Sequence, residues 1–98
     1  MNSTSMALLE AANEGDLVGL IKLVQKGVKI TTTDKWDWTA LHMAAYHGHE
    51  NILIFLINEG LDVDARTFDN ETPLDLALKK GHVRIARIIE EVVKHRAD

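Results

Sequence analysis

Apolar residues in the middle of the chain recur at a helical spacing. Leu41, Ala44 and Ala45 fall at positions i, i+3 and i+4, which places them on one face of a helix. A broader apolar run, Ile52 to Ile57, follows after Gly48 and leaves no polar side to its segment. The pattern therefore predicts two short helices separated by a turn.

Residues that begin and end helices stand where this pattern requires them. Thr39 occupies the position of an N-cap, and Gly48 and Gly60 close the first and second helix. A polar hairpin-like loop is expected before each first helix. Its turn uses Asp37 in one loop and Asn70 in the next, and both residue types tolerate positive φ.

The same pattern occurs three times at a constant offset. Thr39 lies 33 residues after Met6, and Thr72 lies 33 residues after Thr39. Segments that start at these positions align without gaps. The shared columns are Leu8, Leu41 and Leu74; Ala11, Ala44 and Ala77; and Gly15, Gly48 and Gly81. A helix pair this small cannot bury its own apolar face, so the repeats are expected to stack into a solenoid.

These units resemble the ankyrin repeat, whose pattern runs D-x-x-G-x-T-P-L-H-x-A-A-x-x-G-H and ends L-L-x-x-G-A-D-V-N-A. Residues 34–66 match it closely, and residues 6–30 and 67–94 match it as end units. The matching residues of the middle unit are Asp34, Thr39, Leu41, His42, Ala44, Ala45, Gly48, His49, Leu56, Gly60, Asp62, Val63 and Ala65. Asp75 stands where the family has histidine, so the family's histidine network is not expected in the last unit.

The resemblance implies an all-α fold, an ankyrin-repeat solenoid of stacked helix-turn-helix units joined by β-hairpin-like loops. We expect one domain over residues 1–98. Its first repeat, at about 6–33, forms an N-terminal cap, the second covers about 34–66, and the third, at about 67–98, forms a C-terminal cap. With its end units atypical, the chain is expected to be a complete small protein or an autonomous domain.

Composition narrows the classes of partner. The net charge is −4, with 15 acidic and 11 basic residues, so neither nucleic acid nor a membrane surface is expected as a partner. There is no cysteine, which excludes disulfides and thiolate metal sites. The first residues lack the pattern of a secretory signal. We expect an intracellular, cytoplasmic protein, with a nuclear location also open.

Three histidines stand close together, at His42, His47 and His49, and imidazoles at such spacing suggest a metal site. The repeat offers another explanation. His42 matches the family histidine that hydrogen-bonds locally and ties adjacent repeats, and His49 shares its column with His82. Only His47 lies at a variable position. We therefore expect no metal and no cofactor. The sequence also lacks a G-x-S-x-G elbow and a glycine-rich phosphate loop, so an enzyme is not expected.

The resemblance also indicates where a partner protein would bind. In the ankyrin fold the hairpin tips and the exposed side of the first helices form a concave face. Four of the five aromatic residues fall at such positions, and aromatic side chains often anchor interfaces. The candidate positions are Lys35, Trp36, Trp38, Tyr46 and His47 in the middle unit, Phe68, Asp69, Glu71, Lys79 and Lys80 in the last, and Asn13 and Glu14 in the first. An adaptor or inhibitor would use this face.

Two further readings stay open. Neighbours in an extended segment point opposite ways, so one of Trp36 and Trp38 could pack on the loop instead of facing a partner. Ile54 and Phe55 could pack against neighbouring repeats. They could instead join two copies of the chain through the second helices, as a weak homo-oligomer.

Overall fold

The computed structural model describes residues 3–96, which form six α-helices and no β-strand. They are α1 (Ser3–Glu14), α2 (Leu17–Gln25), α3 (Ala40–His47), α4 (Glu50–Asn58), α5 (Pro73–Lys79) and α6 (Val83–Arg96). None of these six is long and apolar enough to cross a membrane. The all-α repeat architecture expected from the sequence is confirmed.

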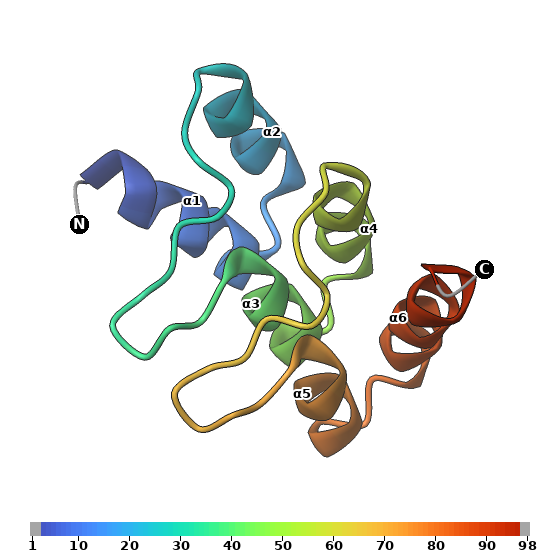
Figure 1. The fold of residues 1–98 in the computed structure, drawn as a ribbon. Helices are drawn as coiled ribbons and strands as arrows, with labels where there is room; N and C mark the ends of the chain where they lie inside the picture. Colours follow the sequence, from blue (N-terminus) through green and yellow to red (C-terminus); the bar gives the residue numbers. More distant parts are fainter. Residues whose placement is uncertain (1–2, 97–98) are drawn as a thin grey trace.

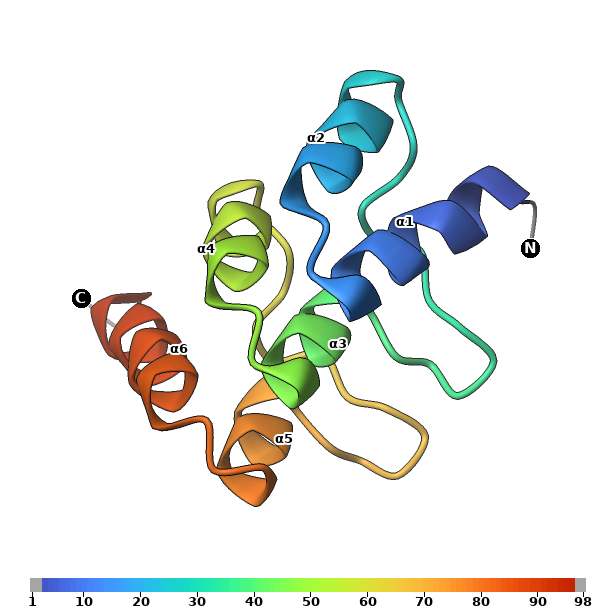
Figure 2. The same cartoon turned by 180° about the vertical axis from the view of Figure 1, so that it is seen from behind.

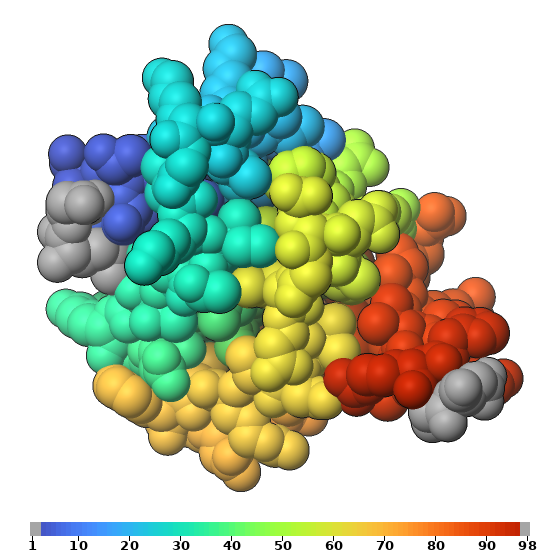
Figure 3. All heavy atoms as spheres, turned by 45° about the horizontal axis from the view of Figure 1, so that its top comes forward, coloured from blue at the N-terminus to red at the C-terminus, as the bar shows by residue number. Residues whose placement is uncertain are grey.

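The helices form two rows. Helices α1, α3 and α5 lie side by side in one row, and α2, α4 and α6 fan out behind them (Figure 1). Each first helix packs on the second helix of its own pair, and α3 also packs between α1 and α5. In the space-filling view the repeats follow one another as neighbouring bands of colour (Figure 3).

Two long loops project to the same side of the first row, as the reverse view shows clearly (Figure 2). We call residues 33–39 the first finger and residues 66–72 the second finger. The two arms of the first finger meet at an isolated antiparallel bridge between Thr33 and Thr39. The loops are thus hairpin-like without containing regular strands.

The core runs through the row of first helices. Leu8, Leu41, Ala44 and Ala77 are completely buried, and Leu20 is completely buried in α2. Alanine at the stacking positions lets neighbouring first helices approach closely, while the larger residues of the second helices fill the space behind them. This division explains why the first helix reads as alanine-rich and the second as leucine- and isoleucine-rich.

The helix starts follow the expected chemistry. Thr39 and Thr72 are N-caps whose hydroxyls accept hydrogen bonds from the backbone N–H groups of His42 and Asp75. In return, the side chains of His42 and Asp75 accept from the N-cap backbone, which completes a capping box in each repeat. Asp75 thus keeps the local half of the histidine's role. Its carboxylate accepts from Thr72 N–H at 2.9 Å.

A histidine from each following repeat closes on the turn of the one before. His82 Nε2–H donates to the carbonyl oxygen of Tyr46 at 3.1 Å. Its ring lies so close to Gly48 that a Cβ there would come within 2.8 Å of it. Gly48 also has φ of 80°, so both the backbone conformation and the neighbouring ring require glycine.

Candidate functional site

The first finger is shaped by Asp34. Its Oδ1 accepts hydrogen bonds from the backbone N–H groups of Trp36 and Trp38, each at 2.9 Å. The Asp37 N–H donates to the Asp34 carbonyl, and Asp37 has φ of 65°, as its place in the turn predicts. These bonds hold the backbone of the finger in one conformation and so position both tryptophans.

The second finger repeats this geometry with a hydroxyl in place of the carboxylate. Thr67 Oγ1 accepts from the N–H groups of Asp69 and Glu71, each at 3.2 Å. Asn70 takes the positive-φ position, with φ of 64°. The two fingers are joined directly, because Phe68 N–H donates to the Trp36 carbonyl oxygen at 3.1 Å. The candidate residues of both fingers therefore belong to one connected surface.

The two tryptophans have different surroundings. Trp36 is 57% exposed, and the Lys35 ammonium lies 4.4 Å from its ring centroid. Trp38 is half-buried and packs against the core. Its ring meets Tyr46 edge-on, with the centroids 5.3 Å apart. Trp38 thus supports the finger on α3, whereas Trp36 is available to solvent.

A row of rings continues from Trp38 along the end of α3. Tyr46 contacts His47 edge-on at 5.1 Å, and His47 stacks on His49 at 6.0 Å. The Lys80 ammonium lies 4.9 Å from the Tyr46 ring centroid. Burial lowers the pKa of His47, and the positive charges of its neighbours His49, Lys80 and His82 lower it further. Near neutral pH this row therefore presents neutral rings beside one ammonium group.

The last repeat contributes the charged part of the candidate surface. Phe68 is 73% exposed on the second finger. Asp69 is exposed beside it, and the Lys79 ammonium lies 3.4 Å from a Glu71 carboxylate oxygen. Charged side chains thus flank the aromatic row on the side of α5.

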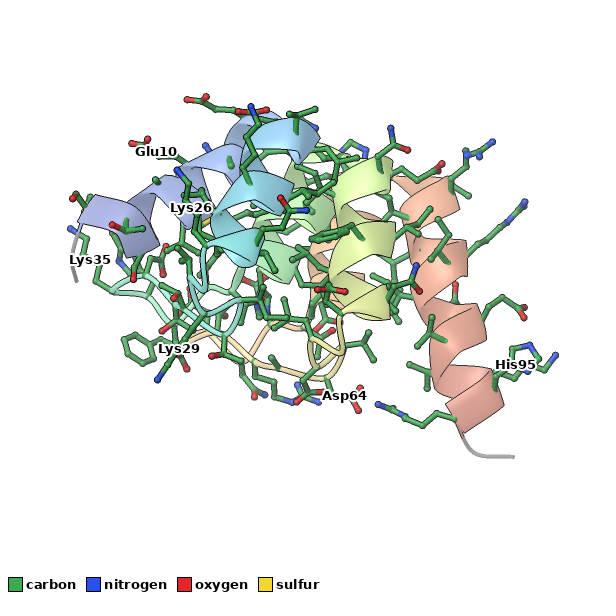
Figure 4. The ribbon with its side chains drawn as sticks, turned by 90° about the horizontal axis from the view of Figure 1, so that it is seen from above. Glu10, Lys26, Lys29, Lys35, Asp64 and His95 are labelled. Atoms are coloured by element: carbon green, nitrogen blue, oxygen red, sulfur yellow. The ribbon has the colours of Figure 1, made fainter. Side chains whose placement is uncertain are left out.

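A groove at the other end of the surface was missed by the sequence analysis. It lies between α1 and the first finger, has a volume of about 480 Å³, and is mainly apolar. Its lining is Met6, Leu9, Glu10, Asn13, Asp34, Lys35, Trp36 and Met43. Figure 4 shows Glu10 and Lys35 at this end of the molecule, far from His95 on α6. Glu14, also expected on this side, is exposed. The signal for the groove was the missing finger before the first repeat.

The histidine rings are used in hydrogen bonds between repeats. Nδ1 of the buried His42 accepts from Thr39 N–H at 3.1 Å, and its Nε2–H faces the carbonyl oxygens of Ala65 and Glu71 at 2.9 and 3.0 Å. This arrangement fits the neutral tautomer with the proton on Nε2. Burial lowers the pKa of His42 and outweighs the two carbonyls, which raise it.

His49 repeats the bond of His82 one unit earlier. Its Nε2–H donates to the Asn13 carbonyl oxygen at 2.9 Å. Over residues 3–96 no three His, Cys, Asp or Glu side chains converge as a set of metal ligands. The histidine positions thus serve the stacking of the repeats.

The second-helix face is less apolar than its sequence suggests. Phe55 is half-buried and packs against the core, which fits the expectation of packing between repeats. Ile54 is 39% exposed. Further along this face, Glu50 and Arg84 form a two-pronged ion pair, with contacts of 2.8 and 3.2 Å. The Arg84 hydrogen bonds hold the pKa of the Glu50 carboxyl below its usual value.

Comparison with known proteins places the chain among repeat proteins. A family model described as ankyrin repeats (3 copies) matches residues 8–96. The chain is 36% identical over 84 residues to ankyrin repeat and SOCS box protein 3 of Homo sapiens, covering 83% of this chain and 16% of that protein. It is 40% identical over 70 residues to protein phosphatase 1 regulatory subunit 27 of Mus musculus, covering 71% and 46%.

A relative named for an enzyme is also similar. Putative glutaminase 2 of Caenorhabditis elegans is 35% identical over 96 residues, covering 93% of this chain and 16% of that protein. The chain thus spans less than half the length of each of these three relatives.

Proposed function

Because the chain belongs to the ankyrin repeat family, whose repeats mediate protein–protein interaction, we propose that it binds a partner protein through its concave face. This face consists of the two fingers and the exposed side of α1, α3 and α5. Binding there would make the chain an adaptor or an inhibitor that occupies part of the partner's surface.

The observation that carries the proposal is the aromatic row at the centre of this face. Trp38, Tyr46 and His47 contact one another in sequence, and the Lys80 ammonium lies over Tyr46. Rings that are already held in place lose little side-chain entropy when a partner covers them. Aromatic residues in such positions are the ones that most often dominate the energy of an interface.

The surroundings of the row also suit a protein interface. Two large apolar side chains stand exposed on either side, Trp36 at 57% and Phe68 at 73%. Charged side chains, including Lys79 and Asp69, lie around them. An apolar centre with a charged rim is the usual anatomy of a protein interface.

The names of the relatives limit the proposal. Protein phosphatase 1 regulatory subunit 27 is named for a regulatory role, which agrees with an adaptor or inhibitor. Putative glutaminase 2 is named for an enzyme, but this chain spans 16% of it, so no glutaminase activity is proposed. Ankyrin repeats are typically non-enzymatic, and binding without catalysis is the function proposed.

The proposal is tested by affinity capture. The parent chain, Trp36→Ala and Tyr46→Ala are immobilised alongside Ile54→Lys, which alters the second-helix face and serves as the control. We expect the control to retain the captured protein and the two alanine variants to lose most of it. Retention by folded alanine variants, together with loss by folded Ile54→Lys, would move the working surface to the second helices. Light scattering then shows whether two copies of the chain meet there.

A further inference from the structure

The first finger has a backbone donor without a partner. On the second finger, Phe68 N–H donates to the Trp36 carbonyl oxygen at 3.1 Å. Lys35 lies 33 residues before Phe68, so its N–H is the equivalent donor on the first finger. Within residues 3–96 no group accepts a hydrogen bond from Lys35 N–H. The row of fingers is therefore open at this edge.

The groove of about 480 Å³ lies beside this open edge. Trp38 shows what would fill it, because its ring packs on Tyr46 and lies 6.1 Å from the His42 ring. The residues 33 positions before His42 and Tyr46 are Leu9 and Asn13, and both line the groove. A finger preceding the first repeat would thus place its own large side chain here.

We propose that an extended segment of a partner protein adds to the first finger and takes the place of this preceding finger. One carbonyl of the segment accepts from Lys35 N–H, and a large apolar side chain two residues later enters the groove. The spacing follows from the chain itself, where the Trp36 carbonyl accepts from Phe68 and the Trp38 ring packs on α3. Such addition of a strand to an open edge is a known mode of peptide recognition.

The walls of the groove support an apolar occupant. Met6 is 50% exposed on α1, and Trp36 forms the opposite wall from the finger. Leu9 and Met43 form the floor, and both are nearly buried. Covering these side chains removes apolar surface from water, which favours binding. The inference rests on the proposed function, since it gives the conformation of the partner at one end of the same concave face.

One substitution removes the donor and spares the finger. Asp37 N–H donates to the Asp34 carbonyl, so Lys35 is the second residue of a four-residue turn, where proline is favoured. Lys35→Pro therefore deletes the N–H with little strain. Lys35→Ala is the matched control, because it removes the same charge and keeps the N–H. Met6→Lys places a charge in the groove at an exposed helical position.

The test uses a phage-displayed library of linear dodecapeptides, selected on the parent chain and counter-selected on Met6→Lys. Selected peptides are synthesised, and their affinities are measured by fluorescence anisotropy, with circular dichroism as the check on folding. We expect peptides with one dominant large apolar side chain. Their affinity should fall about three- to tenfold in Lys35→Pro, the range for one hydrogen bond, and stay near the parent value in Lys35→Ala. The Lys35 amide signal should shift in the ¹⁵N spectrum of the complex.

Two results would overturn the inference. One is a selection that yields no peptide dependent on Met6, and the other is equal binding to Lys35→Pro and Lys35→Ala. The capture experiment with Tyr46→Ala is independent of both. A partner lost with Tyr46→Ala but retained with Lys35→Pro would leave the proposed function in place and remove only the strand addition.

Discussion

The indole ring of Trp38 packs edge-on against the phenol ring of Tyr46, with the centroids 5.3 Å apart and the ring planes at 73°. This contact fastens the first finger to α3. It gives Trp38 a part in stability as well as in the candidate surface, whereas Trp36, two residues earlier, is 57% exposed. Two neighbouring tryptophans in one loop thus have separable roles.

The two tryptophans should differ in their effect on folding. Complete truncation of a buried aromatic residue costs about 3–5 kcal/mol, so the half-buried Trp38→Ala should lower the free energy of unfolding by roughly half of that. Trp36→Ala should change it by no more than about 0.5 kcal/mol, as is usual at exposed sites. Urea unfolding followed by circular dichroism measures both. Equal losses for the two variants would show that the rings share one environment.

Glycine at the ends of α3 and α5 should differ in its tolerance of alanine. Gly48→Ala and Gly81→Ala both place a side chain at positive φ, which costs about 1–2 kcal/mol. Only Gly48→Ala also meets the His82 ring, and such overpacking adds about 1–3 kcal/mol. Gly81→Ala meets no described atom within 4 Å. Thermal melts should therefore place Gly48→Ala below Gly81→Ala; the reverse order would contradict the stacking of His82 on that turn.

Stability should fall as the pH is lowered from about 7.5 through the ordinary histidine pKa of about 6.5. The pKa of His42 is lowered in the folded state, so between that value and 6.5 the unfolded chain binds more protons than the folded chain. Protonation in this window therefore favours unfolding, with a slope of at most about 1.4 kcal/mol per pH unit for one group.

The matched variant for this pH dependence is His42→Gln, which cannot titrate. It should be less stable at every pH, because it disturbs the bonds to Thr39, Ala65 and Glu71, yet its slope between pH 5.5 and 7.5, about one unit either side of the histidine pKa, should be shallower. His47 adds to the slope in the parent, since its pKa is lowered too. A variant slope identical to that of the parent would remove His42 from the account.

Chelators should leave the melting temperature unchanged. The Nε2 atoms of His42, His49 and His82 each face a backbone carbonyl oxygen, so these rings are committed to hydrogen bonds between repeats. Differential scanning calorimetry with and without EDTA tests this. A downward shift of several degrees that added zinc reverses would show that the histidines hold a metal.

The sequence predicted the framework because the framework is periodic. Thr39 and Thr72 were identified as caps, and Asp37 and Asn70 as positive-φ residues, from their repeat positions alone. Each of these roles depends on a few local residues and on a 33-residue offset that the chain itself displays. Periodicity also supplied the reason for His49 and His82, although their carbonyl partners became visible only in the structure.

The surface was harder to predict because it depends on what is absent from a position. Alternation indicated that Trp36 and Trp38 differ, but the ring that packs down was decided by Tyr46, which lies on another element. The groove beside Lys35 exists because no finger precedes α1, and its lining joins residues from α1, the first finger and α3. Similarly, Phe55 and Ile54 were one apolar run in the sequence and differ in burial in the fold.

The most direct test of the concave face as the working surface is a ¹⁵N spectrum of the labelled chain bound to its captured partner. The two tryptophans give two indole N–H signals, and the backbone signals of both fingers report alongside them. We expect both indole signals and the finger amides of residues 34–38 and 67–71 to shift or broaden, while the amides of α4 stay in place. Shifts confined to α4 and α6, with both indole signals unmoved, would contradict the account.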